Sequence, residues 1–336
     1  MNRFLKKIGW FILPCVLIII SIVYLDFFKV FFQYDEYYSE DLFVSLNREY
    51  VCLKKIDQIA ESNKPNSFVF GSSRSQAFKC KDWNQYIGEK SKSFHFDAAN
   101  EALIGVLGKL EYLQKNEIEI NNALVIIDIG LLKQTSFKKR NSSLTISHPK
   151  ISTNSMVDFY SPFISASLNP KFVISYLDYK TFRTHRGYMG QYIANTKYPN
   201  RINEIDMDIF YGKDILIEED SVAYYEKTIK SGIFYDRSSI HVDTSKLEKN
   251  VKEQLIKIKN IFDKNNTQYE IVISPMYDQI EINKEYLKLL NEIFGLEKIH
   301  DFSGINDYTI PLGNYYEKSH YRPHVAREIM KKVYLD

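Results

Sequence analysis

Two short segments near opposite ends of the chain carry side chains that can perform acyl chemistry together. The first is Gly71-Ser72-Ser73-Arg74-Ser75, which directly follows the apolar run SFVF at residues 67–70. A serine between a buried strand and a helix start is held at the sheet edge, where free backbone N–H groups can stabilise an oxyanion. Ser73 is therefore the candidate nucleophile, with helix capping as the alternative role.

The second segment, YYEKSHYRP at residues 315–323, places Glu317 three residues before His320. Within one turn, that spacing can bring a carboxylate onto one imidazole nitrogen and leave the other free. A histidine oriented in this way can take the proton of a serine hydroxyl, whose own pKa is too high for attack at neutral pH. We expect His320 to be the general base, Glu317 to fix its tautomer, and Ser73 to attack.

Polar residues in and beside these segments have alternative roles. Arg74 and Arg322 can bind an anionic group of a substrate or form ordinary ion pairs. Glu317, His320 and His324 are an alternative metal-ligand set, because His320 and His324 have the i, i+4 spacing of a helix face. Pro323 is expected to begin the helix, which would leave His320 outside it. We therefore predict neither a metal nor another cofactor.

Apolar runs and helix-like spacings alternate along the parts of the chain that contain these motifs. This alternation predicts an α/β domain of three layers, with helices on both sides of a mostly parallel sheet. The expected elements, in chain order, are a helix over 37–60, strands at 67–70 and 123–130 with a helix over 102–113 between them, a helix capped by Asp243 or Thr244 and ending near 265, a strand over 269–275, a helix capped by Asn283 and ending near 294, a short strand at 298–304, and a last helix over 324–334.

The N-terminal stretch from residue 8 to residue 25 contains no charged residue. Its 18 residues reach the lower range for crossing a hydrocarbon core of roughly 30 Å, so we expect one uncleaved transmembrane helix. Arg3, Lys6 and Lys7 precede the stretch, which favours a cytoplasmic N-terminus and an extracytoplasmic bulk. We expect Phe27, Phe28, Phe31 and Phe32 to form an interfacial belt.

The sequence divides into a cytoplasmic N-terminus (1–7), the transmembrane helix (8–25), a juxtamembrane connector (26–66) and the α/β domain (67–336). Within the last of these, residues 133–240 lack regular alternation and are expected to form an insertion. Insertions in α/β folds usually leave loops at the carboxyl ends of strands, where ligands bind, so a lid or partner-binding surface is expected. Irregular padding is the alternative.

Composition narrows the classes of partner. Lysine and arginine number 44 against 42 aspartates and glutamates, a formal net charge of +2, so we expect no nucleic acid partner. Three cysteines lack the spacing of a zinc site, and pairing of Cys52 with Cys80 stays open.

A strand followed by G-x-S near the start of the domain, together with Glu-x-x-His before the final helix, resembles the SGNH (GDSL-like) hydrolase superfamily. The segments GSSRS and DFSG…YYEKSHYRP look most like its membrane-anchored bacterial branch, which includes proteins of alginate O-acetylation and of teichoic-acid D-alanylation. The resemblance implies Ser73 as nucleophile, His320 as base and Glu317 in place of the usual aspartate.

The resemblance also implies a function and its partners. It indicates a serine acyltransferase or esterase, anchored in the bacterial cytoplasmic membrane, that acts on acyl groups, acetyl above all, of a cell-surface glycan. A membrane-bound O-acyltransferase is the implied protein partner. The alternative is a non-catalytic assembly factor that binds such an acyltransferase.

The oxyanion motifs of that family are not cleanly matched. FDAANEA at 96–102 stands where a glycine motif belongs, and IIDIG at 126–130 stands where an asparagine motif belongs. The backbone N–H near Ala99 or the side chain of Asn100 is the expected substitute. The loss of one such donor typically costs roughly 2.7 to 4 kcal/mol in the barrier, which keeps the assembly-factor alternative open.

Overall fold

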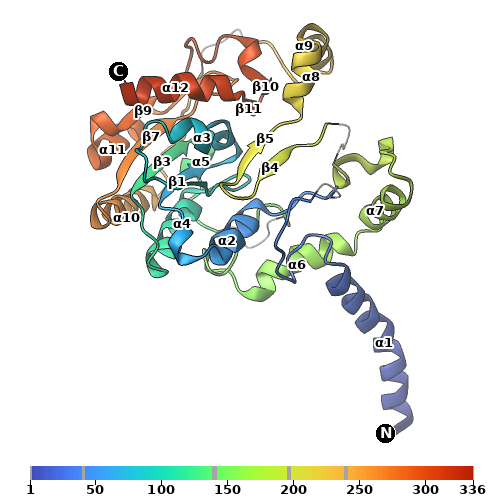
Figure 1. Cartoon of the computed structure of the whole chain (residues 1–336). Helices are drawn as coiled ribbons and strands as arrows, with labels where there is room; N and C mark the ends of the chain where they lie inside the picture. The colour runs from blue at the N-terminus through green and yellow to red at the C-terminus, as the bar shows by residue number, and fades with distance from the viewer. Residues whose placement is uncertain (1, 40–41, 138–141, 195–197, 238–240, 336) are drawn as a thin grey trace.

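A sheet of five parallel strands, in the order β2-β1-β3-β7-β9, forms the centre of the molecule (Figure 1). The computed structural model describes residues 2–39, 42–137, 142–194, 198–237 and 241–335. The strands of the central sheet are β1 (Ser67–Gly71), β2 (Ser93–His95), β3 (Asn122–Ile127), β7 (Gln268–Ile273) and β9 (Ile299–Asp301).

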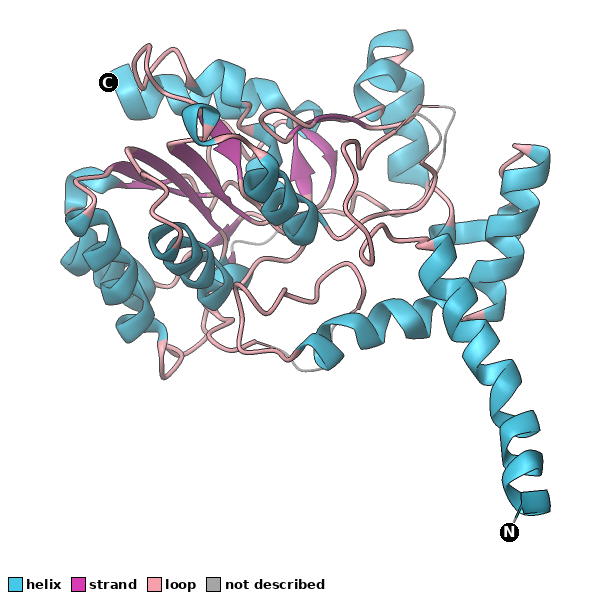
Figure 2. Cartoon of the chain, turned by 60° about the horizontal axis from the view of Figure 1, so that its bottom comes forward, coloured by secondary structure: helices cyan, strands magenta, loops and turns pink. Residues whose placement is uncertain are grey.

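Both faces of the central sheet are covered by helices, which explains why the central strands β1 and β3 are near-continuous apolar runs rather than alternating ones. Phe68 and Phe70 of β1 point to one face, where α2, α4, α10 and α11 pack. Val69 points to the other, where α3 and α12 pack, and Figure 2 shows the helices around the sheet. The prediction of an α/β fold with a mostly parallel sheet is therefore confirmed.

The elements around the sheet lie close to their predicted places. The helices that pack on it are α2 (Arg48–Gln58), α3 (Cys80–Trp83), α4 (Leu103–Lys115), α10 (Val251–Lys264), α11 (Lys284–Phe294) and α12 (Pro323–Leu335). Asn283 caps α11 as predicted, by accepting a hydrogen bond from Glu285 N at 2.8 Å. The cap expected at Asp243 is wrong, because this carboxylate binds Lys133 Nζ and Ser245 instead, and α10 begins later.

The segment between β3 and β7 is well structured, but it adds no described strand to the central sheet. Its elements are α5 (Ile129–Leu132), α6 (Met156–Ser167), α7 (Pro170–Phe182), β4 (Arg201–Asn203), β5 (Asp208–Phe210), α8 (Lys213–Glu219), α9 (Ser221–Lys230) and β6 (His241–Val242). β4 and β5 form an antiparallel pair, and β6 pairs with β8 (Ile280–Glu281). The predicted end of the insertion, near residue 240, lies outside the described residues.

The predicted transmembrane helix is wrong. A helix does form there, α1 (Asn2–Leu25), and it projects from the α/β part of the molecule (Figure 1). Within the described part of the chain, however, no helix combines the length and the apolarity that crossing a membrane requires. The prediction rested on an uncharged stretch of only 18 residues, at the short end of the range for a span. The side chains of Arg3 and Lys6, on which the predicted orientation depends, lie outside the described residues.

The aromatic residues after α1 do not all form an exposed belt. Phe27 and Phe28 are buried, with exposed fractions of 8% and 6%, and each packs its ring 5.3 Å from that of Phe172 in α7. Asp26 holds this turn, since its carboxylate accepts hydrogen bonds from the backbone N–H of Val30 and Phe31. These rings therefore belong to the protein core.

The segment 26–66, expected to be a connector, contributes a core helix. α2 is shorter than predicted, because Asn47 caps it by accepting a hydrogen bond from Tyr50 N at 3.0 Å. Val51, Cys52 and Leu53 in α2 are fully buried. Cys52 and Cys80 are both buried free thiols, so they do not form a disulfide.

We expect Gly71→Ala to destabilise the fold, because β1 and β3 approach closely at this residue. Gly71 has φ +149°, and a Cβ there would lie 2.7 Å from the carbonyl oxygen of Ile126. Strained backbone of this kind costs about 1–3 kcal/mol, so urea denaturation should show a loss of that order in unfolding free energy.

Gly313→Ala is the matched control, since a Cβ at Gly313 would meet nothing within 4 Å. Equal unfolding free energies for the two variants would contradict the close approach at Gly71.

Candidate active site

Ser73 lies at the point where the chain order of the sheet reverses. β1 has β2 on one side and β3 on the other, so the connections that leave β1 and β3 run in opposite directions. Ligands of parallel α/β sheets bind at such a switch point, outside the carboxyl ends of the strands. Ser73 follows the carboxyl end of β1 by two residues and begins a 3₁₀ turn, Ser73–Ala77.

Asp128, at the carboxyl end of β3, fixes the turn that carries Ser73. Its Oδ2 accepts hydrogen bonds from Ser72 Oγ at 2.7 Å and from Arg74 Nη1 at 2.9 Å. Its Oδ1 accepts from Leu131 N at 2.9 Å and so caps α5. One carboxylate thus holds both neighbours of Ser73, and Arg74 takes the ion-pair role rather than facing a ligand.

Glu317 and His320 lie on a short antiparallel hairpin rather than in a helical turn. The hairpin consists of β10 (Tyr315–Glu317) and β11 (His320–Tyr321), and Glu317 is directly opposite His320 in the register. Residues paired across antiparallel strands have neighbouring side chains. This pairing explains how a three-residue spacing brings carboxylate and imidazole together.

The structure brings Ser73, His320 and Glu317 into one chain of hydrogen bonds. Ser73 Oγ lies 2.7 Å from His320 Nε2, and His320 Nδ1 is bonded to Glu317 Oε1. Glu317 Oε2 accepts from Ser319 N at 2.8 Å, which orients the carboxylate. Nucleophile, base and orienting acid are arranged as in hydrolases that act through an acyl-serine.

The electrostatics of Glu317 suit an orienting acid. Burial raises the pKa of this carboxyl group, but the hydrogen bond from His320 and the nearby positive charges outweigh burial and lower the pKa below its usual value. Glu317 is therefore ionised at neutral pH and can stabilise an imidazolium on His320. Lys213 Nζ, 4.0 Å from Glu317 Oε1, adds to this effect.

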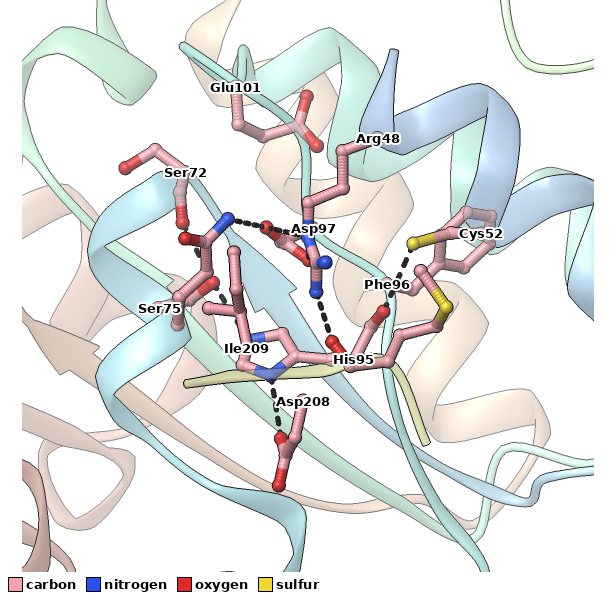
Figure 3. Close-up of polar contacts among 12 residues, drawn as sticks. Arg48, Cys52, Ser72, Ser75, His95, Phe96, Asp97, Glu101, Asp208 and Ile209 are labelled. Carbon is pink, nitrogen blue, oxygen red and sulfur yellow. Dashed lines mark hydrogen bonds and ion pairs between the residues drawn. The ribbon is translucent and has the colours of Figure 1, made fainter. Parts of the chain in front are cut away.

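A second serine–histidine–acid chain lies two residues along from the first (Figure 3). Ser75 Oγ is 3.1 Å from His95 Nε2, and His95 Nδ1 is 3.3 Å from Asp208 Oδ1. The side chains of His95 and Asp208 are 0% and 2% exposed, whereas those of His320 and Glu317 are 25% and 18% exposed. Ser75 is also fully buried and donates to Ser72 O, so a substrate can reach only the Ser73 chain.

A buried ion pair lies behind the candidate site. Arg48 Nε and Asp97 Oδ2 are 2.7 Å apart (Figure 3). Burial raises the pKa of Asp97, but the charge of Arg48, together with His95, the hydrogen bond from Gln76 and the charge of Lys109, outweighs burial and lowers this pKa. Gln76 Nε2 donates to Asp97 Oδ2 at 2.6 Å, and Tyr211 Oη donates to Gln76 Oε1.

This network ends beside the imidazole of His320. The ring of Tyr211 lies 5.9 Å from that of His320 and 5.1 Å from that of Tyr316. Tyr211 follows β5 within the insertion, so the insertion supplies one wall of the site.

The predicted oxyanion residues, Ala99 and Asn100, lie beside the strand that leads to Ser73. Ala98 N donates to Gly71 O at 3.2 Å, which aligns the segment before Ala99 and Asn100 with the end of β1. Asn100 is exposed and has φ +53°. Both residues line a small cavity of about 30 Å³ whose lining does not include Ser73.

The alternative metal set at the C-terminal motif is not assembled. His324 Nε2 bonds Asn314 Oδ1 at 3.0 Å, while His320 is occupied by Ser73 and Glu317. Arg322 faces Asp214 Oδ1 at 3.4 Å.

One other set of metal-ligating side chains occurs in the described part of the chain: Cys80, His95 and Asp208, whose ligand atoms lie within 4.8 Å of one another. Both nitrogens of His95 already have partners, and Cys80 N donates to both oxygens of Asp208. Burial raises the pKa of the Cys80 thiol well above its usual value, which disfavours the thiolate that binds metal. These residues act as a structural hydrogen-bonded cluster.

Several residues around the site were missed by sequence reasoning. Tyr211, Asp208 and Arg48 come from stretches without a motif, and their partners are distant in sequence. The only local signal is the density of tyrosines in the insertion, which does not point to a particular residue.

Comparison with protein-family models gave no match, and the sequence matches no curated protein. The SGNH-like assignment thus stays a prediction that rests on the motifs and their geometry.

We expect Glu317→Gln to reduce kcat for ester hydrolysis by about 10³- to 10⁴-fold, because the amide cannot stabilise the imidazolium and favours the wrong tautomer. Hydrolysis of a chromogenic acetyl ester at neutral pH measures the effect.

Glu270→Gln provides a matched control, since Glu270 also bonds a histidine, His300 Nε2 at 2.8 Å, but lies outside the site. If both variants kept wild-type rates, Glu317 would have no orienting role.

Proposed function

We propose that the protein is a serine acyltransferase or esterase that acts on acyl groups of a cell-surface glycan. The observation that carries the proposal is the 2.7 Å contact between Ser73 Oγ and His320 Nε2, with Glu317 on the other imidazole nitrogen. These side chains are part-exposed at the carboxyl end of the sheet, where a substrate can reach them.

The mechanism follows from the donors and acceptors of the three side chains. Ser73 Oγ attacks the acyl carbon while His320 Nε2 takes the hydroxyl proton, and Glu317 stabilises the resulting imidazolium. The tetrahedral intermediate collapses to an acyl-serine, and His320 gives its proton to the leaving oxygen. A sugar hydroxyl or water then attacks the acyl-serine and loses its proton to His320. His320 returns this proton to Ser73 Oγ as the acyl–serine bond breaks, which restores the free serine.

An oxyanion site is needed for both attacks. The backbone N–H of Ala99 and the side chain of Asn100 are the proposed donors, supported by the alignment of their segment with the end of β1. Each such donor is worth roughly 2.7 to 4 kcal/mol of barrier.

The choice of substrate rests on the resemblance of the two motifs to the SGNH branch that modifies bacterial polysaccharides. Acetyl is the proposed acyl group, and a membrane-bound O-acyltransferase is the proposed donor partner. The expected location outside the cytoplasm stays a prediction.

The test uses the full-length protein with an acetyl ester and a fluorophosphonate that labels activated serines. Ser73→Ala and His320→Ala should each lower ester turnover by at least about 10³-fold, because the members of a serine–histidine–acid unit act together. Peptide mass analysis should find the label on Ser73 in the wild type.

Ser165→Ala, at an exposed serine of α6, should keep wild-type turnover and labelling. Turnover that survives in Ser73→Ala would rule out the proposed nucleophile. An unreactive wild type that still captures an O-acyltransferase would instead support the assembly-factor alternative.

A further inference from the structure

A cleft of about 540 Å³ opens beside the candidate active site. Its walls come from three parts of the chain: the residues after the Ser73 turn, the insertion, and the start of α12. We call it the basic cleft, after the basic side chains that line it, which are Lys79, Lys81, Arg201, Arg322 and Arg327.

The basic cleft is contiguous with the catalytic side chains. Tyr211 lines the cleft, and its ring lies 5.9 Å from that of His320. Arg322 follows His320 by two residues, and Asp214, another lining residue, accepts a hydrogen bond from Tyr316 of the same hairpin. Ser73, Glu317 and His320 do not line the cleft, but a molecule held in it would contact Tyr211 and Arg322, which lie beside His320. The volume falls within the range typical of ligand sites.

The charges in the cleft are unbalanced. Its five basic side chains face three acidic ones, Asp82, Asp214 and Glu218. The two ion pairs among these groups are long, 3.4 Å for Arg322–Asp214 and 3.5 Å for Arg327–Asp82.

Two of the basic groups have unused capacity for an anion. Lys81 and Arg201 are exposed, and neither forms an ion pair with any described residue. Arg322 differs, because its Nε is buried and its Nη2 faces Asp214. Lys79 also differs, because its ammonium donates to the carbonyl oxygens of Gln76 and Ile209.

The first residues of α12 strengthen the positive potential. Pro323 and His324 line the cleft, and Pro323 is the first residue of a 13-residue helix. The amino end of a helix carries partial positive charge and favours anions. The helix end and the basic side chains thus act on the same space.

We propose that the basic cleft binds an anionic group of the acyl-bearing glycan, a phosphate or a carboxylate, beside the ester that Ser73 attacks. This inference rests on the proposed function and narrows its substrate class to an acidic polymer. Guanidinium and ammonium groups bind both anions, with bidentate contacts available to arginine.

The experiment compares three matched esters: mono-O-acetylated glucose, glucuronate and glucose 6-phosphate. We expect kcat/KM of the full-length protein to be about tenfold higher for an anionic ester than for the neutral one, the value of one charge-assisted contact. The larger of the two anionic preferences identifies carboxylate or phosphate as the natural group. The double variant Lys81→Gln/Arg201→Gln leaves three basic side chains against three acidic ones in the cleft. Its kcat/KM should therefore be about equal for the anionic and the neutral esters.

Lys288→Gln is the control, because it removes one positive charge at an exposed residue of α11 and should keep the preference. Equal kcat/KM for all three esters, with turnover dependent on Ser73, would overturn the inference and leave the proposed function standing. An absence of Ser73-dependent turnover would overturn the proposed function.

If no Ser73-dependent turnover is found, calorimetry with glucose 6-phosphate and with glucuronate tests whether the basic cleft binds anions. At least one of them should bind the wild type about tenfold more tightly than the double variant, and equal or undetectable binding of both would overturn the inference.

Discussion

The contact between Ser73 Oγ and His320 Nε2 is the constraint on which the rest of the site depends. It joins residues 247 positions apart, so the fold between them must bring the two side chains within hydrogen-bond distance. The parallel sheet positions Ser73, through β1 and the carboxylate of Asp128 after β3. The hairpin β10–β11 positions His320, with Tyr321 buried against Phe78.

Two serine–histidine–acid chains lie close together in the sequence, and accessibility rather than composition distinguishes the proposed reactive set from the other. Ser75, His95 and Asp208 have nearly the same hydrogen-bond pattern as the Ser73 set, but they are enclosed by the core. In that position they bind the insertion to the sheet, because Asp208 belongs to β5. A buried polar network of this kind stabilises the fold when all its polar groups have hydrogen-bond partners.

Sequence reasoning was most successful where the signal is local. Continuous apolar runs predicted β1, β3 and β7, and Asn283 predicted the start of α11. The pairing of Ser73, Glu317 and His320 could be expected because two motifs flank the domain. The helix over 8–25 was overestimated as a membrane span from a count of uncharged residues alone. Phe27 and Phe28 were predicted to be interfacial because their partner, Phe172, lies some 145 residues away in the sequence. Tyr211 could not be predicted because its contacts with Gln76 and His320 exist only in the folded chain.

The hydrogen bond from Tyr211 to Gln76 ties the insertion to the turn that carries Ser73. Displacing this part of the insertion would break that bond and leave the amide oxygen of the buried Gln76, whose Nε2 donates to Asp97, without its partner, at a cost of about 1–3 kcal/mol. β5 and Tyr211 are therefore held against the sheet, and α8 is held against the hairpin in the same way, since Asp214 accepts a hydrogen bond from Tyr316. Substitutions in this part of the insertion that change ligand selectivity would consequently also alter the surroundings of His320.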